Sequence, residues 1–96
     1  MATYVMLVTL TEKGAQDLQG IAERRPKQLE QLEQHGIKIV ADYALMGEYD
    51  FLYVVEAPDN LAMMQQIMKD STSGTIRFHT MPAFPMDQFA DMAKQM

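Results

Sequence analysis

The chain has 96 residues, 48% hydrophobic and 22% charged, a balance that predicts a single globular domain over residues 1–96 and excludes a disordered chain. A net charge of −5 argues against a nucleic-acid partner, because binding to a phosphate backbone requires clustered Lys and Arg. The lack of cysteine excludes disulfide and thiol chemistry and favours the cytoplasm, and we expect neither a membrane span nor a secretory leader.

The first part of the chain predicts a strand followed by a broken helix. Thr3–Leu10, with the sequence TYVMLVTL, is rich in β-branched residues and predicts the first strand. Thr11 can cap a helix whose apolar stripe continues to Gln34. We expect that helix to break or kink near Arg24–Pro26, because proline lacks an N–H group and disfavours helical angles at the residue before it.

The middle of the chain predicts two strands joined by a tight corner. Gly36 fits the left-handed conformation that closes a helix, and Ile37–Met46 follows as the second strand. Residues Gly47 to Asp50 turn the chain into the third strand, Phe51–Ala57. At this turn we expect Gly47 to adopt a positive φ and Asp50 to accept hydrogen bonds from the amides of the turn.

The last part predicts a helix, a strand and a terminal helix. Asp59 or Asn60 caps a helix that ends at the sequence DSTSG, and TIRFHTMPAF forms the fourth strand. The sequence PMDQFADMAKQM is a terminal helix with Pro85 near its first turn. Ten methionines in the chain fit either core filling or adaptable contacts with a ligand or a subunit.

This order, β-α-β-β-α-β plus a terminal helix, predicts the α+β class and a ferredoxin-like fold with both helices on one face of a four-stranded antiparallel sheet. Strand alternation separates the side chains into two sets. The set expected under the helices is Tyr4, Met6, Val8, Leu10, Ile37, Ile39, Ala41, Tyr43, Leu45, Phe51, Tyr53, Val55, Ile76, Phe78 and Thr80. The set expected on the other face is Thr3, Val5, Leu7, Thr9, Lys38, Val40, Asp42, Ala44, Met46, Leu52, Val54, Glu56, Arg77, His79 and Met81.

The second set is apolar at its centre and charged at its margins, whereas the free face of an antiparallel sheet is normally polar. An apolar sheet face of this size is typical of an interface. The simplest partner is a second copy related by a two-fold axis, so we expect a homodimer or a larger ring, packed sheet against sheet.

Four stretches in this order resemble the GYD-domain family over nearly the whole chain. They are TEKG, RRPKQLEQLEQHGIKI, YALMGEYDFLYVVEAPDN and TMPAF, with Glu48 between the glycine and the tyrosine of the corner. The resemblance implies a dimeric α+β barrel and implies little about activity. The GEYDFL corner is also similar to the effector-binding domain of the leucine-responsive regulator family, where it lies beside amino-acid sites between subunits.

The corner and the second face supply the candidate ligand-binding residues. Tyr49 and Asp50 either shape the turn or receive the polar head of a ligand at a subunit junction. Arg77, His79 and Asp42 share a face in this assignment, where they either form ion pairs at the rim or provide an anion site. In the second case His79 is the residue suited to moving a proton near neutral pH.

Tyr4, Tyr43 and Tyr53 are expected on the helix side, either as core or as the lining of a pocket between sheet and helices. Two separated histidines, no HExxH spacing and no glycine-rich phosphate loop predict no metal and no cofactor. We therefore expect a homo-oligomeric small-molecule-binding or interaction module without evident catalytic machinery. The alternative is a small cofactor-free enzyme of the oxygenase or isomerase type that uses the pocket and acts on a small aromatic or carbonyl metabolite.

Overall fold

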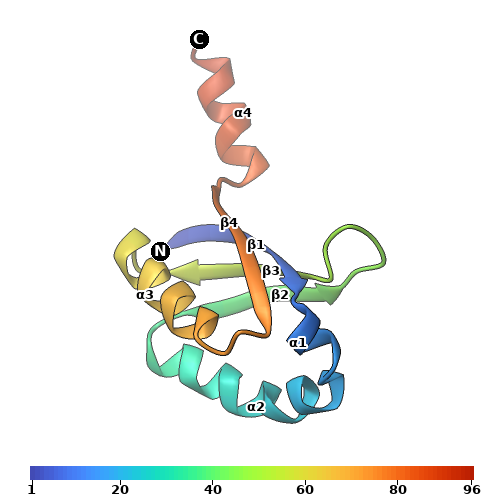
Figure 1. Ribbon diagram of the computed structural model, residues 1–96. Coiled ribbons are helices and arrows are strands. Elements are labelled where there is room, and N and C mark those ends of the chain that lie inside the picture. Colours follow the sequence, from blue (N-terminus) through green and yellow to red (C-terminus); the bar gives the residue numbers. More distant parts are fainter.

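The computed structural model describes all 96 residues and contains four strands and four helices (Figure 1). In chain order they are β1 (Ala2–Leu10), α1 (Glu12–Ala15), α2 (Leu18–Gln34), β2 (Lys38–Ala44), β3 (Phe51–Ala57), α3 (Asn60–Ser71), β4 (Ile76–Ala83) and α4 (Met86–Lys94).

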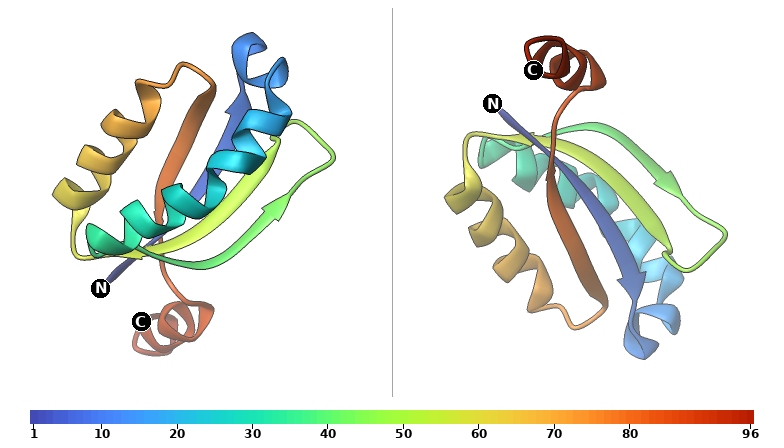
Figure 2. Two further views of the ribbon diagram at one scale, coloured as in Figure 1. Left: turned by 90° about the horizontal axis from the view of Figure 1, so that it is seen from below. Right: turned by 90° about the horizontal axis from the view of Figure 1, so that it is seen from above.

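The strands form one antiparallel sheet in the order β2-β3-β1-β4. Helices α2 and α3 cover one face of this sheet, and the strands are uncovered on the other (Figure 2). This arrangement confirms the predicted ferredoxin-like α+β fold.

Polar side chains begin the helices that flank the sheet. Thr11 accepts a hydrogen bond from the amide of Gly14 at the start of α1, and Asp59 accepts one from Ala62 at the start of α3. Both bonds satisfy an amide that has no partner within its own helix. The caps therefore fix where each helix leaves its strand.

Of the two outcomes predicted near Arg24–Pro26, a break or a kink, the break is wrong. The helix breaks earlier, at Asp17, whose carboxylate accepts a hydrogen bond from Gly20 and starts α2 afresh. Helix α2 then runs through Pro26 without interruption. Pro26 leaves the carbonyl of Ala22 without its helical donor, but both residues are exposed, so water can bind that carbonyl.

The two turns around β2 differ in their use of glycine. Gly36 has a φ of +77°, as predicted for the residue that closes α2. The expected positive φ at Gly47 is wrong, because the positive-φ residues are Gly36 and Gly74. Strand β2 also ends at Ala44, so the corner is a six-residue loop rather than a tight turn.

A β-bulge in β2 corrects the face assignment of its second half. Ile39 lies opposite Val55, but the next partner of β3, Val54, lies opposite Ala41. The extra residue reverses the alternation, because two residues of one strand then face one residue of the other. Asp42, opposite Tyr53, consequently lies on the helix side, and the predicted helix-side position of Ala41 and Tyr43 is wrong.

The core lies toward one end of the space between sheet and helices. It consists of Tyr4, Met6, Val8, Leu32, Ile37, Val55, Ala57 and Met63. The only α2 residue in this cluster comes from the last turns of the helix, whereas Leu18 in its first turn is 57% exposed. The N-terminal half of α2 therefore stands over the sheet without a filled core beneath it.

Candidate functional site

The first candidate surface is the uncovered side of the sheet, which we call the open face. The registers place on it Thr3, Val5, Leu7, Thr9, Lys38, Ala41, Tyr43, Leu52, Val54, Glu56, Arg77, His79 and Met81. At its centre Val5 lies between Val54 and Met81 on the neighbouring strands. No helix of the chain shields these apolar side chains (Figure 2), and they are only partly buried. The open face therefore keeps the apolar centre and charged margins that the sequence predicts.

The corner is tied to the sheet by its aspartate. The Asp50 carboxylate accepts a hydrogen bond of 2.8 Å from the amide of Leu10, at the end of β1. The amide of Asp50 donates to the carbonyl of Val8, and its carbonyl accepts from Leu45. Asp50 thus holds the loop against β1. The amide that donates to its carboxylate belongs to β1, whereas an amide of the turn was predicted.

Tyr49 extends the open face beyond the strands. Its ring meets that of His79 edge-on, with centroids 6.2 Å apart, and its hydroxyl lies 3.5 Å from Nδ1 of His79. Arg77 is exposed on the same face, opposite Thr9. The structure therefore gathers Tyr49, Arg77 and His79 on the open side of the sheet.

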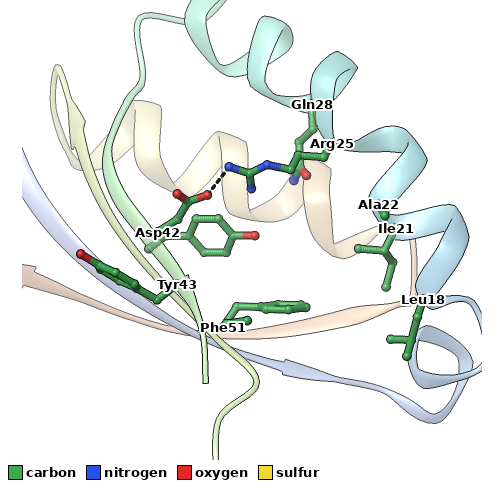
Figure 3. A pocket seen from close by; sticks show the side chains of 10 residues that line it. Leu18, Ile21, Ala22, Arg25, Gln28, Asp42, Tyr43 and Phe51 are labelled. Atoms are coloured by element: carbon green, nitrogen blue, oxygen red, sulfur yellow. Dashed lines mark ion pairs between the residues drawn. The ribbon is translucent and has the colours of Figure 1, made fainter. Parts of the chain in front are cut away.

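The second candidate site is a cavity of about 430 Å³ under the N-terminal half of α2. Its lining comprises Leu18, Ile21, Ala22, Arg25, Gln28, Asp42, Tyr43, Ala44, Phe51 and Tyr53 (Figure 3). The bulge brings Asp42 to this cavity, where its carboxylate lies 2.5 Å from the guanidinium of Arg25. Both charges remain partly exposed, so the cavity combines apolar walls with an ion pair that presents both signs.

Two half-buried ionisable groups, Tyr53 and Asp70, lie along this interior. Burial raises the pKa of the Tyr53 phenol, against a smaller lowering by Arg25, so the phenol stays protonated at neutral pH and can donate a hydrogen bond. Burial also raises the pKa of the Asp70 carboxyl, opposed by its hydrogen bond from Gln66. A second cavity of about 380 Å³ lies between them, bordered by Phe51, Tyr53 and Asp70.

The three tyrosines predicted to line a pocket lie in different surroundings. Tyr4 is 3% exposed in the core, where its hydroxyl donates to the side-chain oxygen of Asn60, and it does not line the 430 Å³ cavity. Tyr43, on the edge strand β2, is 64% exposed and borders the cavity mouth. Of the three tyrosines, Tyr53 is the one whose side chain lies within the cavity wall on the helix side.

Arg25 is the residue of the cavity that sequence reasoning missed, because the helix was expected to break or kink near Arg24–Pro26. A signal was present. Leu18, Ile21 and Ala22 precede Arg25 at helical spacing, which puts all four on one side of an unbroken helix. Without the break, that spacing directs Arg25 toward the sheet.

The chain has no group of three or more His, Asp or Glu side chains close enough to hold a metal ion. No helix of the chain has the length and apolarity needed to cross a membrane.

Residues 4–93 match the GYD domain family. A Thermus thermophilus protein named glutamine synthetase and cystathionine beta-lyase binding protein is 36% identical over 87 residues, which cover 90% of this chain and 92% of that protein. The crystal structure of FFRP-DM1 is similar with a TM-score of 0.56 at 23% identity, covering 88% of this chain and all of that one. The Mycobacterium tuberculosis leucine response regulatory protein has a TM-score of 0.60 at 14% identity, covering 88% of this chain and 51% of that one. At these identities the two structures support the fold alone.

Proposed function

Because this chain belongs to the GYD domain family, whose match spans residues 4–93, we propose that it is a homo-oligomeric interaction module of the cytoplasm that binds a protein partner. The 36% identical relative is named for binding two enzymes, glutamine synthetase and cystathionine beta-lyase. Those two enzymes are therefore the first partners to test.

The observation that carries the homo-oligomer is the apolar centre of the open face. Val5, Leu7, Leu52 and Val54 lie side by side there, since Val5 pairs with Val54 and Leu7 with Leu52. Removing apolar surface from water contributes roughly 25 cal/mol per Å². A second copy is the partner always present at matched concentration, and a two-fold axis places the same patch on both sides of the contact.

The charged margin supports a self-complementary contact. Lys38 and Glu56 lie opposite each other on β2 and β3, and Arg77 lies on β4 at the other edge. A margin with both signs of charge can pair with its own rotated copy, whereas a margin of one sign would repel it. Tyr49, next to His79, would then lie at the subunit boundary.

The test of the protein partner is a binding titration. Purified chain is titrated against purified glutamine synthetase and against purified cystathionine beta-lyase from the same organism, with an unrelated oligomeric enzyme as control. We expect saturable binding to at least one of the two enzymes and none to the control. Equal binding to all three, or to none at about 100 µM chain, would contradict an enzyme-binding role.

The cavity favours a second candidate function, binding of a small molecule. Its volume of about 430 Å³ lies within the range of ligand pockets. The Arg25–Asp42 pair and the Tyr53 phenol suit a ligand with a polar end, and Ile21 and Phe51 suit an apolar body. Because burial raises the pKa of the Tyr53 phenol, this group is available to donate a hydrogen bond to the polar end of such a ligand.

The ligand is sought by a thermal-shift screen of aromatic acids, amino acids and quinones. A ligand of this cavity should raise the Tm of the parent and fail to raise that of Arg25→Met, which keeps much of the side-chain length without the charge. The matched control is Arg24→Met, whose side chain pairs with Asp17 outside the cavity. A ligand that stabilises all three proteins equally would place binding elsewhere.

A further inference from the structure

Helix α4 has an apolar side that nothing in its own chain covers. Met86, Phe89 and Met92 of α4, and Phe84 just before the helix, are between 51% and 72% exposed, and no residue of α4 is buried. Figure 1 shows the helix projecting away from the sheet and from α2 and α3. An isolated helix of nine residues is not stable in water, because its few backbone hydrogen bonds do not offset the free-energy cost of helix nucleation. The helix therefore needs a surface to pack against.

The charges of α4 favour a helix. Asp87 in the first turn and Lys94 in the last turn complement the helix dipole, whereas Pro85 at the N-cap makes no side-chain hydrogen bond. Its apolar residues recur at helical spacing, while Asp87, Asp91 and Lys94 lie on the opposite side. A sequence that specifies an amphipathic helix so fully and leaves its apolar side exposed indicates a docking element.

The course of the chain indicates where the docking surface lies. Met81 on β4 belongs to the open face, and the chain continues from β4 to α4 within a few residues. In the view onto the open face, α4 lies on the viewer's side of the sheet, away from α2 and α3 (Figure 2). Helix α4 therefore lies on the same side of the sheet as the open face.

We propose that α4 is exchanged between subunits: in the dimer, the apolar side of each α4 packs against the other copy of this chain. This inference rests on the proposed homodimer and adds a contact distinct from the pairing through the open face. The methionines of α4 suit this role, since unbranched side chains adapt to a surface that forms only on assembly.

The size of the open face supports the exchange. Four strands about 4.8 Å apart and about seven residues long at 3.3 Å per residue give the open face a flat footprint of about 450 Å². Two exchanged helices, each about 13 Å long, would add apolar area from both copies to a contact of this footprint.

The first experiment uses two adjacent substitutions that add the same charge. Phe89→Asp puts a carboxylate on the apolar side of α4, and Gln88→Asp puts one beside Asp87 and Asp91, outside that side. We expect Phe89→Asp to raise the dimer Kd at least about tenfold in sedimentation equilibrium, and Gln88→Asp to leave it within about twofold. Equal Kd values for Phe89→Asp and the parent would overturn the exchange.

The second experiment asks which surface α4 covers. It distinguishes packing on a second copy from packing on the open face of the same chain. The chain has no Trp, so Phe89→Trp introduces a single fluorescent reporter. We expect its emission to shift to the red on dilution through the dimer Kd, because the indole becomes exposed when the copies separate. A blue-shifted emission that does not change on dilution would show α4 packing within its own chain and would overturn the proposal.

Val54→Lys tests the pairing through the open face separately. If Val54→Lys stays dimeric while Phe89→Asp dissociates, helix exchange stands and the open-face pairing fails. If Val54→Lys dissociates while Phe89→Asp stays dimeric, the exchange fails and the open-face pairing stands. A parent that is monomeric at about 100 µM contradicts both.

Discussion

Gly14 is the position at which the structure predicts the sharpest effect of a single methyl group. Gly14 is buried in α1, and a Cβ at this position would lie 2.0 Å from the carbonyl oxygen of Thr75. That oxygen already accepts a 2.9 Å hydrogen bond from the amide of Thr11, and the Thr11 hydroxyl donates to the carbonyl of Gly74. The methyl group of Gly14→Ala must therefore push α1 away from the start of β4.

The expected loss of stability follows from those contacts. Overpacking costs about 1–3 kcal/mol, and each hydrogen bond broken as α1 moves costs about 0.5–1.5 kcal/mol. We expect Gly14→Ala to lower the free energy of unfolding by about 2–5 kcal/mol in urea titrations followed by circular dichroism.

Gly47→Ala is the matched control. A Cβ there would meet nothing within 4 Å, and Gly47 does not have a positive φ. The substitution should be neutral or stabilise by about 0.4–1 kcal/mol, because it restricts the unfolded chain. Unchanged stability in Gly14→Ala, or an equal loss in both variants, would refute the close approach of α1 to Thr75.

Three further predictions concern single side chains. Asp50→Ala should cost about 1–3 kcal/mol in urea unfolding, because the amide of Leu10 loses its acceptor, and unchanged stability would contradict that role. The folded protein binds a proton at Asp70 more tightly than the unfolded chain, so stability should fall as pH rises from 3.8 through the raised pKa. Asp70→Asn should remove that fall; an unaltered pH profile would show that Asp70 does not cause it. Pro26→Ala should stabilise by about 1–3 kcal/mol in thermal unfolding, because the carbonyl of Ala22 regains a donor, and a loss would mean that Pro26 shapes α2.

Local patterns in the sequence were sufficient to predict the order of elements and the two faces of β1 and β3. The alternation in TYVMLVTL and the turn residues around β3 are properties of adjacent residues, and the structure retains them. Gly36 was predicted for the same reason, since the left-handed conformation follows from one residue type.

A pocket between sheet and helices was one of the predicted alternatives, but its Arg25–Asp42 ion pair could not be predicted, because the pair depends on two events that local patterns do not determine. One extra residue in β2 turned Asp42 to the helix side, and no residue type marks a bulge of this kind. The uninterrupted passage of α2 through Pro26 directed Arg25 toward Asp42, although the local preference of proline favours a break. In both cases tertiary packing prevails over the local pattern.

The measurement that tests the central claim most directly is the mass of Val54→Lys in sedimentation equilibrium beside that of Met64→Lys. Val54 lies at the centre of the open face, and Met64 is exposed on α3, on the other side of the sheet. Pairing through the open face predicts a dimer or larger oligomer for the parent and for Met64→Lys, and a folded monomer of 10.9 kDa for Val54→Lys. A Val54→Lys variant with the same mass as the parent at all concentrations would contradict the account.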